Sequence, residues 1–242
     1  MTADELAIEI RAIEFAKKHR TEIARAIACK AKYPEEEVPM SVFMAGSPGA
    51  GKTEVSKAFI ALLQSYGSNA LRIDPDDLRD HFPDYTGSNS ALFQKAVSKI
   101  VERLVDLVLD QRQSFLLDGT LANLSVARRN IERSIKRGRQ TQIVYVYQKP
   151  ELAWRFVVAR EVTEGRNIPC DEFIRQFFAA KSTVCSLKAE FGTLLQVDVI
   201  VKNNDGDTAD IGIDLAVDEI DAMTLHNYDP EVLKKSLTEV NP

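Results

Sequence analysis

The stretch Ala45-Gly-Ser-Pro-Gly-Ala-Gly-Lys-Thr-Glu54 decides the fold, because it contains a complete GxxxxGK[ST] pattern. A buried-strand pattern, VPMSVFMAG at residues 38–46, precedes the motif, and a helical pattern starts near Lys52. The glycines at 46, 49 and 51 can adopt positive φ and expose successive backbone N–H groups at a helix N-terminus. A strand, a glycine-rich loop and a helix in this order predict a P-loop that holds nucleotide phosphates.

The motif gives the loop residues their expected roles. We expect the nucleotide to bind to Gly46, Ser47, Pro48, Gly49, Ala50, Gly51, Lys52 and Thr53. Lys52 should reach the β- and γ-phosphates of ATP or GTP, and the Thr53 hydroxyl should bind Mg²⁺. The alternative is a glycine-rich helix start without a ligand, which the flanking strand and helix disfavour.

Strand-like and helical segments alternate along the rest of the chain. Strands are predicted at 38–46, 69–74, 114–118, 142–147 and 197–202, and helices at 52–65, 90–111, 123–137, 151–164 and 171–190. This alternation predicts an α/β fold of the P-loop kinase type, a three-layer sandwich with a mainly parallel sheet of about five strands. Residues 4–32 add one or two helices. We expect a helical extension at 1–34 and one kinase domain at 35–242, with an acidic solvated loop near its end.

Acidic residues at two strand ends distinguish the classes of P-loop protein. Arg72-Ile-Asp-Pro-Asp-Asp77 ends the second strand, and SFLLDGT at 114–120 contains one acid, Asp118. The late segment at 201–205 lacks the NKxD element of a GTPase, and a single acid at 118 differs from the acid pair usual in translocating ATPases. An acid after the second strand favours a small-molecule kinase, because an accepting hydroxyl needs a carboxylate in line with the γ-phosphate.

Three blocks, AGSPGAGKTE at 45–54, IDPDDLRDHFPDY at 73–85 and FLLDGTLAN at 115–123, resemble the zeta toxin family of P-loop kinases. The resemblance extends from about residue 38 to residue 183. It implies that ATP or GTP, with Mg²⁺, phosphorylates a sugar hydroxyl of UDP-N-acetylglucosamine or a related UDP-sugar. It also implies a toxin that an antitoxin protein holds as its partner. Separately, the start MTADELAIEI lacks the pattern of a signal peptide, and with no apolar run of membrane-span length this predicts a cytoplasmic protein.

The resemblance identifies Asp76 as the catalytic base, and Arg79 of the same block as a substrate-side residue. Thr120 matches a substrate-contacting threonine, and Asp118 stands where the family usually has glutamate, as a substrate or metal ligand. The alternative for the aspartates is a turn or helix cap.

Two arginines of VAREVTEGRNIP at 158–169, Arg160 and Arg166, resemble the lid arginines that clamp the transferring phosphoryl group. The alternative is that both are solvated. By fold analogy, Lys202 and Asn203 after the last strand should border the nucleotide base.

Two departures from the family pattern leave the acceptor open. Ala122 stands where members specific for UDP-sugars tend to have a basic residue, and Asp118 is one methylene shorter than glutamate. The alternatives are another small-molecule or polynucleotide phosphotransferase, or a non-catalytic protein that responds to nucleotide binding.

Charge and hydropathy exclude several function classes. The net charge is −5, and residues 204–242 hold ten acids against two lysines, so a globally basic nucleic-acid binder is excluded. The basic helix at 126–139 is best explained as a solvated face, and the alternative is that it binds RNA or an acidic partner. No apolar run approaches the length of a membrane span. The N-terminal helices are expected either to serve as scaffold or to inhibit the cleft as a built-in antitoxin does.

Overall fold

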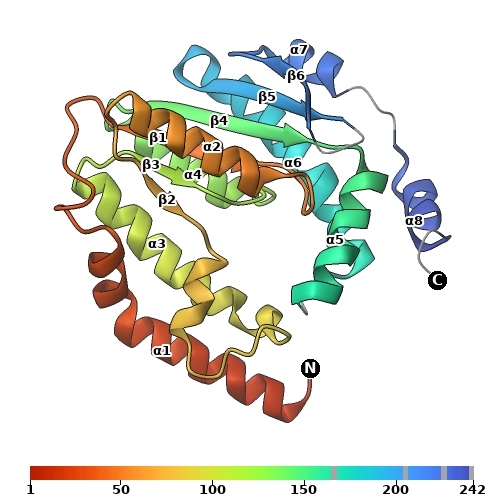
Figure 1. The fold of residues 1–242 in the computed structure, drawn as a ribbon, viewed down its shortest axis with the longest axis horizontal. Helices are drawn as coiled ribbons and strands as arrows, with labels where there is room; N and C mark the ends of the chain where they lie inside the picture. The colour runs from red at the N-terminus through yellow and green to blue at the C-terminus, as the bar shows by residue number, and fades with distance from the viewer. Residues whose placement is uncertain (165–167, 204–206, 225–227, 240–242) are drawn as a thin grey trace.

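The computed structural model describes residues 1–164, 168–203, 207–224 and 228–239 of the chain (Figure 1). A central sheet carries helices on both faces, and the N-terminal helix lies outside one of these helices. The chain therefore forms the layers that the alternating sequence pattern predicts.

Within the described residues six strands form the sheet, in the order β2-β3-β1-β4-β5-β6. The pairs among β1 to β5 are parallel, and β6 pairs antiparallel with β5. The strands are β1 (Met40–Ala45), β2 (Leu71–Ile73), β3 (Phe115–Leu117), β4 (Gln140–Tyr147), β5 (Gln196–Lys202) and β6 (Thr208–Gly212). The predicted α/β fold with a mainly parallel sheet is confirmed.

The helices of the described residues connect these strands and extend the chain at both ends. The α-helices are α1 (Ala3–Ile27), α2 (Lys52–Ser65), α3 (Gln94–Asp110), α4 (Leu124–Ile135), α5 (Pro150–Glu164), α6 (Cys170–Phe191), α7 (Val217–Met223) and α8 (Pro230–Glu239). Short 3-10 helices are η1 (Asp77–His81), η2 (Ser90–Phe93) and η3 (Gly192–Leu194). None of the helices in the described ranges is apolar over a length that could cross a membrane.

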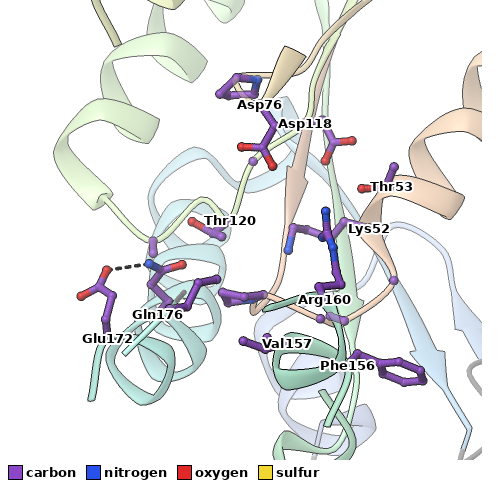
Figure 2. Close-up of a pocket in the computed structure, with 18 of the residues that line it drawn as sticks. Lys52, Thr53, Asp76, Asp118, Thr120, Phe156, Val157, Arg160, Glu172 and Gln176 are labelled. Carbon is purple, nitrogen blue, oxygen red and sulfur yellow. Dashed lines mark hydrogen bonds between the residues drawn. The ribbon is translucent and has the colours of Figure 1, made fainter. Parts of the chain in front are cut away.

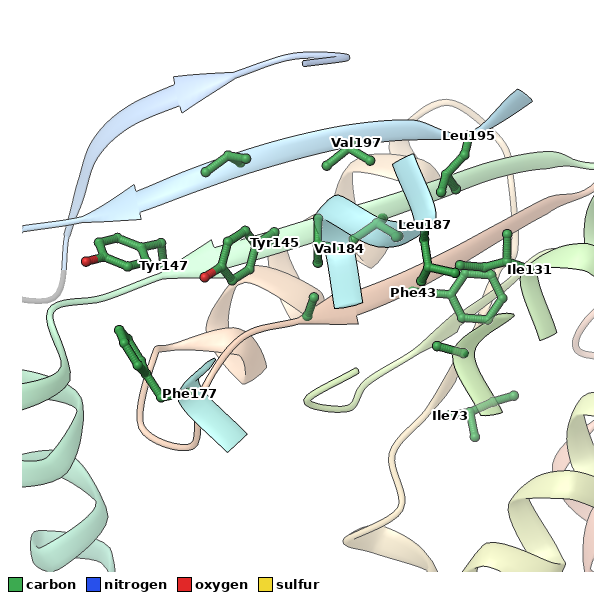
Figure 3. Close-up of a cluster of buried hydrophobic side chains, with 14 of the residues drawn as sticks. Phe43, Ile73, Ile131, Tyr145, Tyr147, Phe177, Val184, Leu187, Leu195 and Val197 are labelled. Atoms are coloured by element: carbon green, nitrogen blue, oxygen red, sulfur yellow. The ribbon is translucent and has the colours of Figure 1, made fainter. Parts of the chain in front are cut away.

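Alternate side chains of the central strands face two different helical layers. Val42 and Met44 of β1 belong to the cluster that packs against α2, whereas Phe43 belongs to the cluster on the opposite face. Figure 3 shows this second cluster, in which Val184 and Leu187 of α6 lie against the sheet. Because both faces are covered, the central strands are continuous apolar runs, which explains why the sequence reveals them.

The acidic segment after β5 is not the solvated loop that the sequence predicts, because it contains β6 and α7. The side chains of residues 208–211 are all exposed, so β6 has no apolar stripe that a sequence pattern could reveal. Its pairing relies on backbone contacts with β5, such as Ile200 with Ile211. The sheet therefore has one strand more than predicted, as an antiparallel edge strand.

The long helix α1 packs against α3 rather than against the sheet (Figure 1). Ala12, Ala16 and Ile23 of α1 are buried in a cluster that also contains Ile100 of α3. Phe15 contacts Phe82, with ring centroids 5.4 Å apart. The helix begins at a capping box, because Thr2 and Glu5 exchange hydrogen bonds. These contacts support the scaffold interpretation of α1.

Basic residues of α4 and of the turn after it form ion pairs with acidic side chains of the same chain. Three arginines of α4 pair with acids of α3 and α6: Arg128–Glu190, Arg129–Glu102 and Arg133–Asp106. The two basic residues that follow the helix form the pairs Lys136–Glu132 and Arg137–Asp110. The positive charges of this face thus have acidic partners from the same chain.

Deletion of residues 1–33 should destabilise the protein without raising any phosphate transfer, because it removes one side of the cluster between α1 and α3. Urea unfolding followed by circular dichroism, together with transfer from labelled ATP, tests this. A stable truncated protein with higher activity than the full chain would show instead that α1 is inhibitory.

A matched pair of substitutions in α1 tests the same packing without a truncation. Ile23→Ala should lower the free energy of unfolding by about 2–5 kcal/mol, because Ile23 is 8% exposed. Ile10→Ala should change it by about 0.5 kcal/mol, because Ile10 is 48% exposed. Equal effects of the two substitutions would contradict the packing described here.

Candidate active site

The parallel register brings three loops to one edge of the sheet. Phe43 of β1 pairs with Leu117 of β3, and Leu117 pairs with Ile73 of β2. The next residues along β3 and β2 are Asp118 and Asp74, and the Asp118 N–H donates to the Ile73 carbonyl at 2.8 Å. The P-loop follows β1 at the same edge, so both acids lie beside it.

The loop between β1 and α2 has the backbone that its glycines predict. The φ angles of Gly46, Gly49 and Gly51 are 135°, 73° and 88°. The Lys52 ammonium donates to the carbonyls of Gly46 at 3.0 Å and Ser47 at 2.6 Å. The lysine side chain therefore folds over the loop, at the N-terminus of α2.

Two of these glycines are also required by neighbouring backbone. A Cβ atom at Gly46 would lie 2.3 Å from the carbonyl oxygen of Val146, and one at Gly49 would lie 2.1 Å from that of Ala153. Any side chain at either position would push the loop away from β4 or α5. The close packing of the loop thus depends on glycine for two separate reasons.

The segment after β3 is held against the P-loop. The Gly46 N–H donates to the Thr120 carbonyl at 3.2 Å. The following residue, Leu121, has φ of 55°, a conformation that costs a non-glycine residue about 1–2 kcal/mol. Its side chain packs on the main core, which holds this conformation in place. Thr120 and Ala122 on either side of it line the cavity described below.

One arginine lies between the two acids at the strand ends. Arg72 Nη2 donates to Asp74 Oδ2 at 2.5 Å and to Asp118 Oδ2 at 2.6 Å. Ser56 of α2 donates to the same Asp118 oxygen at 2.7 Å. Burial raises the pKa of Asp74, although the Asp76 N–H and the Arg72 charge oppose this. Burial acts to lower the pKa of Arg72, but the Asp118 hydrogen bond and the Asp74 charge outweigh it and raise this pKa.

Asp76 lies just beyond this cluster and contacts a second arginine. Arg79 Nη1 donates to Asp76 Oδ1 at 2.6 Å, and the side chains are 5% and 38% exposed, respectively. Arg79 Nη2 lies 3.5 Å from Gln94 Oε1. Arg79 Nε is buried and has no hydrogen-bond partner among the described residues. Asp76 is therefore oriented by a nearly buried guanidinium but remains accessible.

A cavity of about 1160 Å³ joins the P-loop to these acids. Lys52, Asp76, Asp118, Thr120 and Arg160 all line it, and Figure 2 shows their side chains around the same space. Pockets that bind one drug-sized ligand have volumes of about 300–1,000 Å³. The cavity is therefore large enough for a nucleotide and a second molecule side by side.

The far end of the cavity contains residues that the sequence analysis did not identify. Glu172 of α6 accepts from Arg175 Nη2 at 2.6 Å and from Gln176 Nε2 at 2.5 Å (Figure 2 marks the second bond). The Arg175 hydrogen bond lowers the pKa of Glu172. Gln94 and Asn123 line the cavity as well. In the sequence these residues have the pattern of an ordinary polar helix face or loop, so no motif reveals them.

The two residues predicted to border the nucleotide base have different positions. Lys202 lines the cavity, and its ammonium lies 3.7 Å from Glu54. Asn203 is not among the lining residues, and its backbone and side chain bond with Asp207 instead. The predicted lid arginine Arg166 lies outside the described residues, whereas Arg160 projects from α5 into the cavity.

The residues present fit a magnesium site that is completed by phosphate oxygens. The described residues contain no group of three or more His, Cys, Asp or Glu that could hold a metal by itself. Mg²⁺ in kinases is usually held by one or two protein oxygens together with substrate phosphates and water. Thr53 and Asp118, which line the same cavity, offer a hydroxyl and a carboxylate of this kind.

The solved structures that resemble this chain include one from the PezAT chromosomal toxin–antitoxin system of Streptococcus pneumoniae. It has a TM-score of 0.63 at 17% identity, over 99% of this chain and 94% of that chain. A chain of AvrRxo1-ORF1:-ORF2 with ATP has a TM-score of 0.59 at 15% identity, over 92% of this chain and 74% of that one. At these identities the likeness shows the fold.

Sequence comparison gives the family. Toxin PezT of Streptococcus pneumoniae serotype 4 (strain ATCC BAA-334 / TIGR4) is 27% identical over 129 residues, which cover 50% of this chain and 50% of that toxin. The chain thus aligns with half the length of this curated relative. The family model described as Zeta toxin matches residues 23–215, a range that includes the P-loop, both strand-end acids and α5. Because this match covers most of the chain, the protein belongs to the zeta toxin family.

Proposed function

We propose that the protein is a kinase that transfers the γ-phosphate of ATP or GTP to a hydroxyl of a small molecule, and that this molecule is a UDP-sugar such as UDP-N-acetylglucosamine. The observation that carries the proposal is the single cavity that joins the P-loop to the accessible carboxylate of Asp76. Membership of the zeta toxin family supports the same reaction class.

The nucleotide side of the site consists of the P-loop and the start of α2. In our proposal the loop N–H groups and the N-terminus of α2 bind the phosphates, and Lys52 turns from its loop carbonyls to the β- and γ-phosphates. Mg²⁺, held by Thr53 and Asp118, would neutralise charge on the transferring phosphate when it is bound. Lys202 adds a cation at the same end of the cavity.

Asp76 suits the role of general base better than its neighbour Asp74. The Asp74 side chain is 13% exposed, and its two oxygens accept from Arg72 and from the Asp76 N–H. The Asp76 side chain is 38% exposed. A base must reach the hydroxyl proton directly, so the accessible carboxylate is the one that can accept it.

We propose roles for the remaining predicted residues on the acceptor side and at the transferring phosphoryl group. We propose that Thr120 and Arg79 position the acceptor, since both line the cavity that Asp76 lines. Arg160, and Arg166 outside the described residues, are proposed to stabilise the charge that develops on the transferring phosphoryl group. Arginine suits this role because its planar donors match phosphate oxygens.

The far end of the cavity suits a large polar acceptor. Arg175, Gln176, Gln94 and Asn123 line the cavity and offer hydrogen-bond donors, and a UDP-sugar offers diphosphate, hydroxyl and amide acceptors. Ala122 contributes no cation at this end. In our proposal the diphosphate is therefore bound by donors from α6, from Gln94 at the start of α3 and from Asn123 in the loop after β3, without a cation from that loop.

We also propose that a separate antitoxin protein binds this chain. The similar structures come from the PezAT toxin–antitoxin system and from an AvrRxo1-ORF1:-ORF2 complex. Among the described residues, none of α1 lines the cavity, so α1 leaves it accessible. A partner that covers the cavity would then control the kinase in trans.

Substitution of the proposed base or of the P-loop lysine should greatly slow transfer and preserve the fold. We expect Asp76→Asn and Lys52→Ala to lower kcat by about 10²–10³-fold, because each removes a group that acts on the transition state. Transfer from γ-labelled ATP measures this. Asp77→Asn is the matched control, because Asp77 neighbours Asp76 but is 74% exposed. Full activity of Asp76→Asn would remove Asp76 from the mechanism.

A panel of acceptors tests the substrate class. Labelled ATP with UDP-N-acetylglucosamine, other UDP-sugars, nucleosides and RNA should give a labelled UDP-sugar, and Arg175→Ala should raise the KM for that acceptor by about tenfold, since a hydrogen bond to a charged group contributes about 1.5 kcal/mol. Label in nucleosides or RNA alone would contradict the UDP-sugar assignment while the kinase assignment stands.

A further inference from the structure

Arg72 is a charged residue inside a short, buried strand. Leu71 and Ile73 on either side of it are 3% and 1% exposed, and the Arg72 side chain is 16% exposed. Its position on β2 directs the guanidinium away from those two side chains and toward α2 and the end of β3. A strand of three residues gains little from such a side chain, so its contacts indicate another role.

The guanidinium contacts four side chains from three parts of the fold. Nη2 bonds with Asp74 and Asp118, Nε donates to Ser56 Oγ at 3.0 Å, and Nη1 lies 3.4 Å from Asp77. The planar guanidinium thus connects the residues that follow β2 and β3 with α2, the helix after the P-loop. Without it, the carboxylates of Asp74 and Asp118 would face each other at close range in a partly buried site and repel.

A further hydrogen bond links Asp74 to Asp76, the proposed base. Asp74 Oδ2 accepts from Arg72, and Asp74 Oδ1 accepts from the Asp76 backbone N–H at 2.8 Å. The Asp74 carboxylate therefore holds the turn from which Asp76 projects, while Arg79 holds the Asp76 side chain. Arg72 thus orients the Asp76 backbone through Asp74, and Arg79 orients the Asp76 side chain directly.

We propose that Arg72 is a positioning residue for phosphate transfer, because it holds Asp118 at the metal side and, through Asp74, the turn that carries Asp76. The inference rests on the proposed kinase function. Arg72 itself is not expected to touch either substrate, since it is absent from the residues that line the cavity. Its removal should alter the placement of two acids without removing either of them.

The first readout is structural and needs no activity. In ¹⁵N-labelled protein, Arg72→Gln should shift the Asp76 amide signal upfield and speed its hydrogen exchange by about tenfold, because the bond to Asp74 loosens. Asp77→Asn should leave the hydrogen-exchange rate of this amide unchanged, since Asp77 contacts the guanidinium only at Nη1, 3.4 Å away. An unchanged Asp76 amide in Arg72→Gln would overturn the inference.

The second readout is kinetic. Arg72→Gln should lower kcat by about 10²-fold, the effect of a small misplacement of catalytic groups, and change the KM for ATP by less than about threefold. Arg72→Lys should also lose activity, because a lysine keeps the charge but cannot bond in one plane with Asp74, Asp118 and Ser56. It is the second variant if Arg72→Gln does not fold.

Arg139 provides a control for the general cost of losing a buried arginine. It is 6% exposed and donates to the Ser41 hydroxyl and to the carbonyls of Met40 and Gln113, at the opposite end of the strands. Arg139→Gln should lower stability but leave the Asp76 amide and the kcat of the folded protein unchanged. Equal losses of kcat in the Arg72 and Arg139 variants would show that Arg72 has only a structural role.

The outcomes separate this inference from the proposed function. If wild type transfers phosphate and Arg72→Gln keeps its kcat within about twofold, the positioning role fails and the kinase stands. If wild type transfers no phosphate to any acceptor of the panel, the proposed function fails. The positioning of Asp76 by Arg72 is then decided by the amide signal alone.

Discussion

Parallel pairing of β1, β2 and β3 is the constraint on which the rest of the site depends. Because these strands run in the same direction and in fixed register, the loops that follow them leave the sheet at one edge. This register brings the P-loop, Asp74 and Asp118 to the same end of the sheet. The loop can then close over the edge only because two of its glycines lie against the carbonyls of Val146 and Ala153.

Placing three acids at one edge creates an electrostatic cost that two arginines offset in different ways. Arg72 is shared by Asp74 and Asp118, whereas Arg79 contacts Asp76. Partly buried ion pairs of this kind are weak contributors to stability, because desolvation cancels much of the attraction. Their value here is orientation, since each carboxylate is held at a defined angle before any substrate arrives.

The sequence predicts those parts of the molecule whose signal is local. The P-loop glycines, the strand before them and the acids after β2 and β3 are recognisable because each role depends on neighbours in the chain. Strand β6 escaped prediction because its exposed side chains carry no pattern, and its stability depends on the edge of β5.

The sequence also does not reveal residues whose role depends on partners far away in the chain. Arg72 was visible only as a charge in an apolar strand, and its partners Ser56 and Asp118 lie 16 and 46 positions away. Glu172 and Arg175 reach the cavity only because α6 starts beside it. A motif search cannot find such residues, but a buried charge next to acids at a strand end is a signal that could have identified Arg72.

The packing of α1 connects the outside of the molecule with the proposed base. Leu78 and Phe82 at η1 are buried in the same cluster as Ala12 and Ala16 of α1. The short helix η1 also carries Arg79, whose guanidinium bonds with Asp76. A 3-10 helix of five residues has little stability of its own, so its position depends on this cluster. The helix α1 thus supports the orientation of Asp76 from a distance and leaves the cavity itself accessible to substrates or to a separate partner.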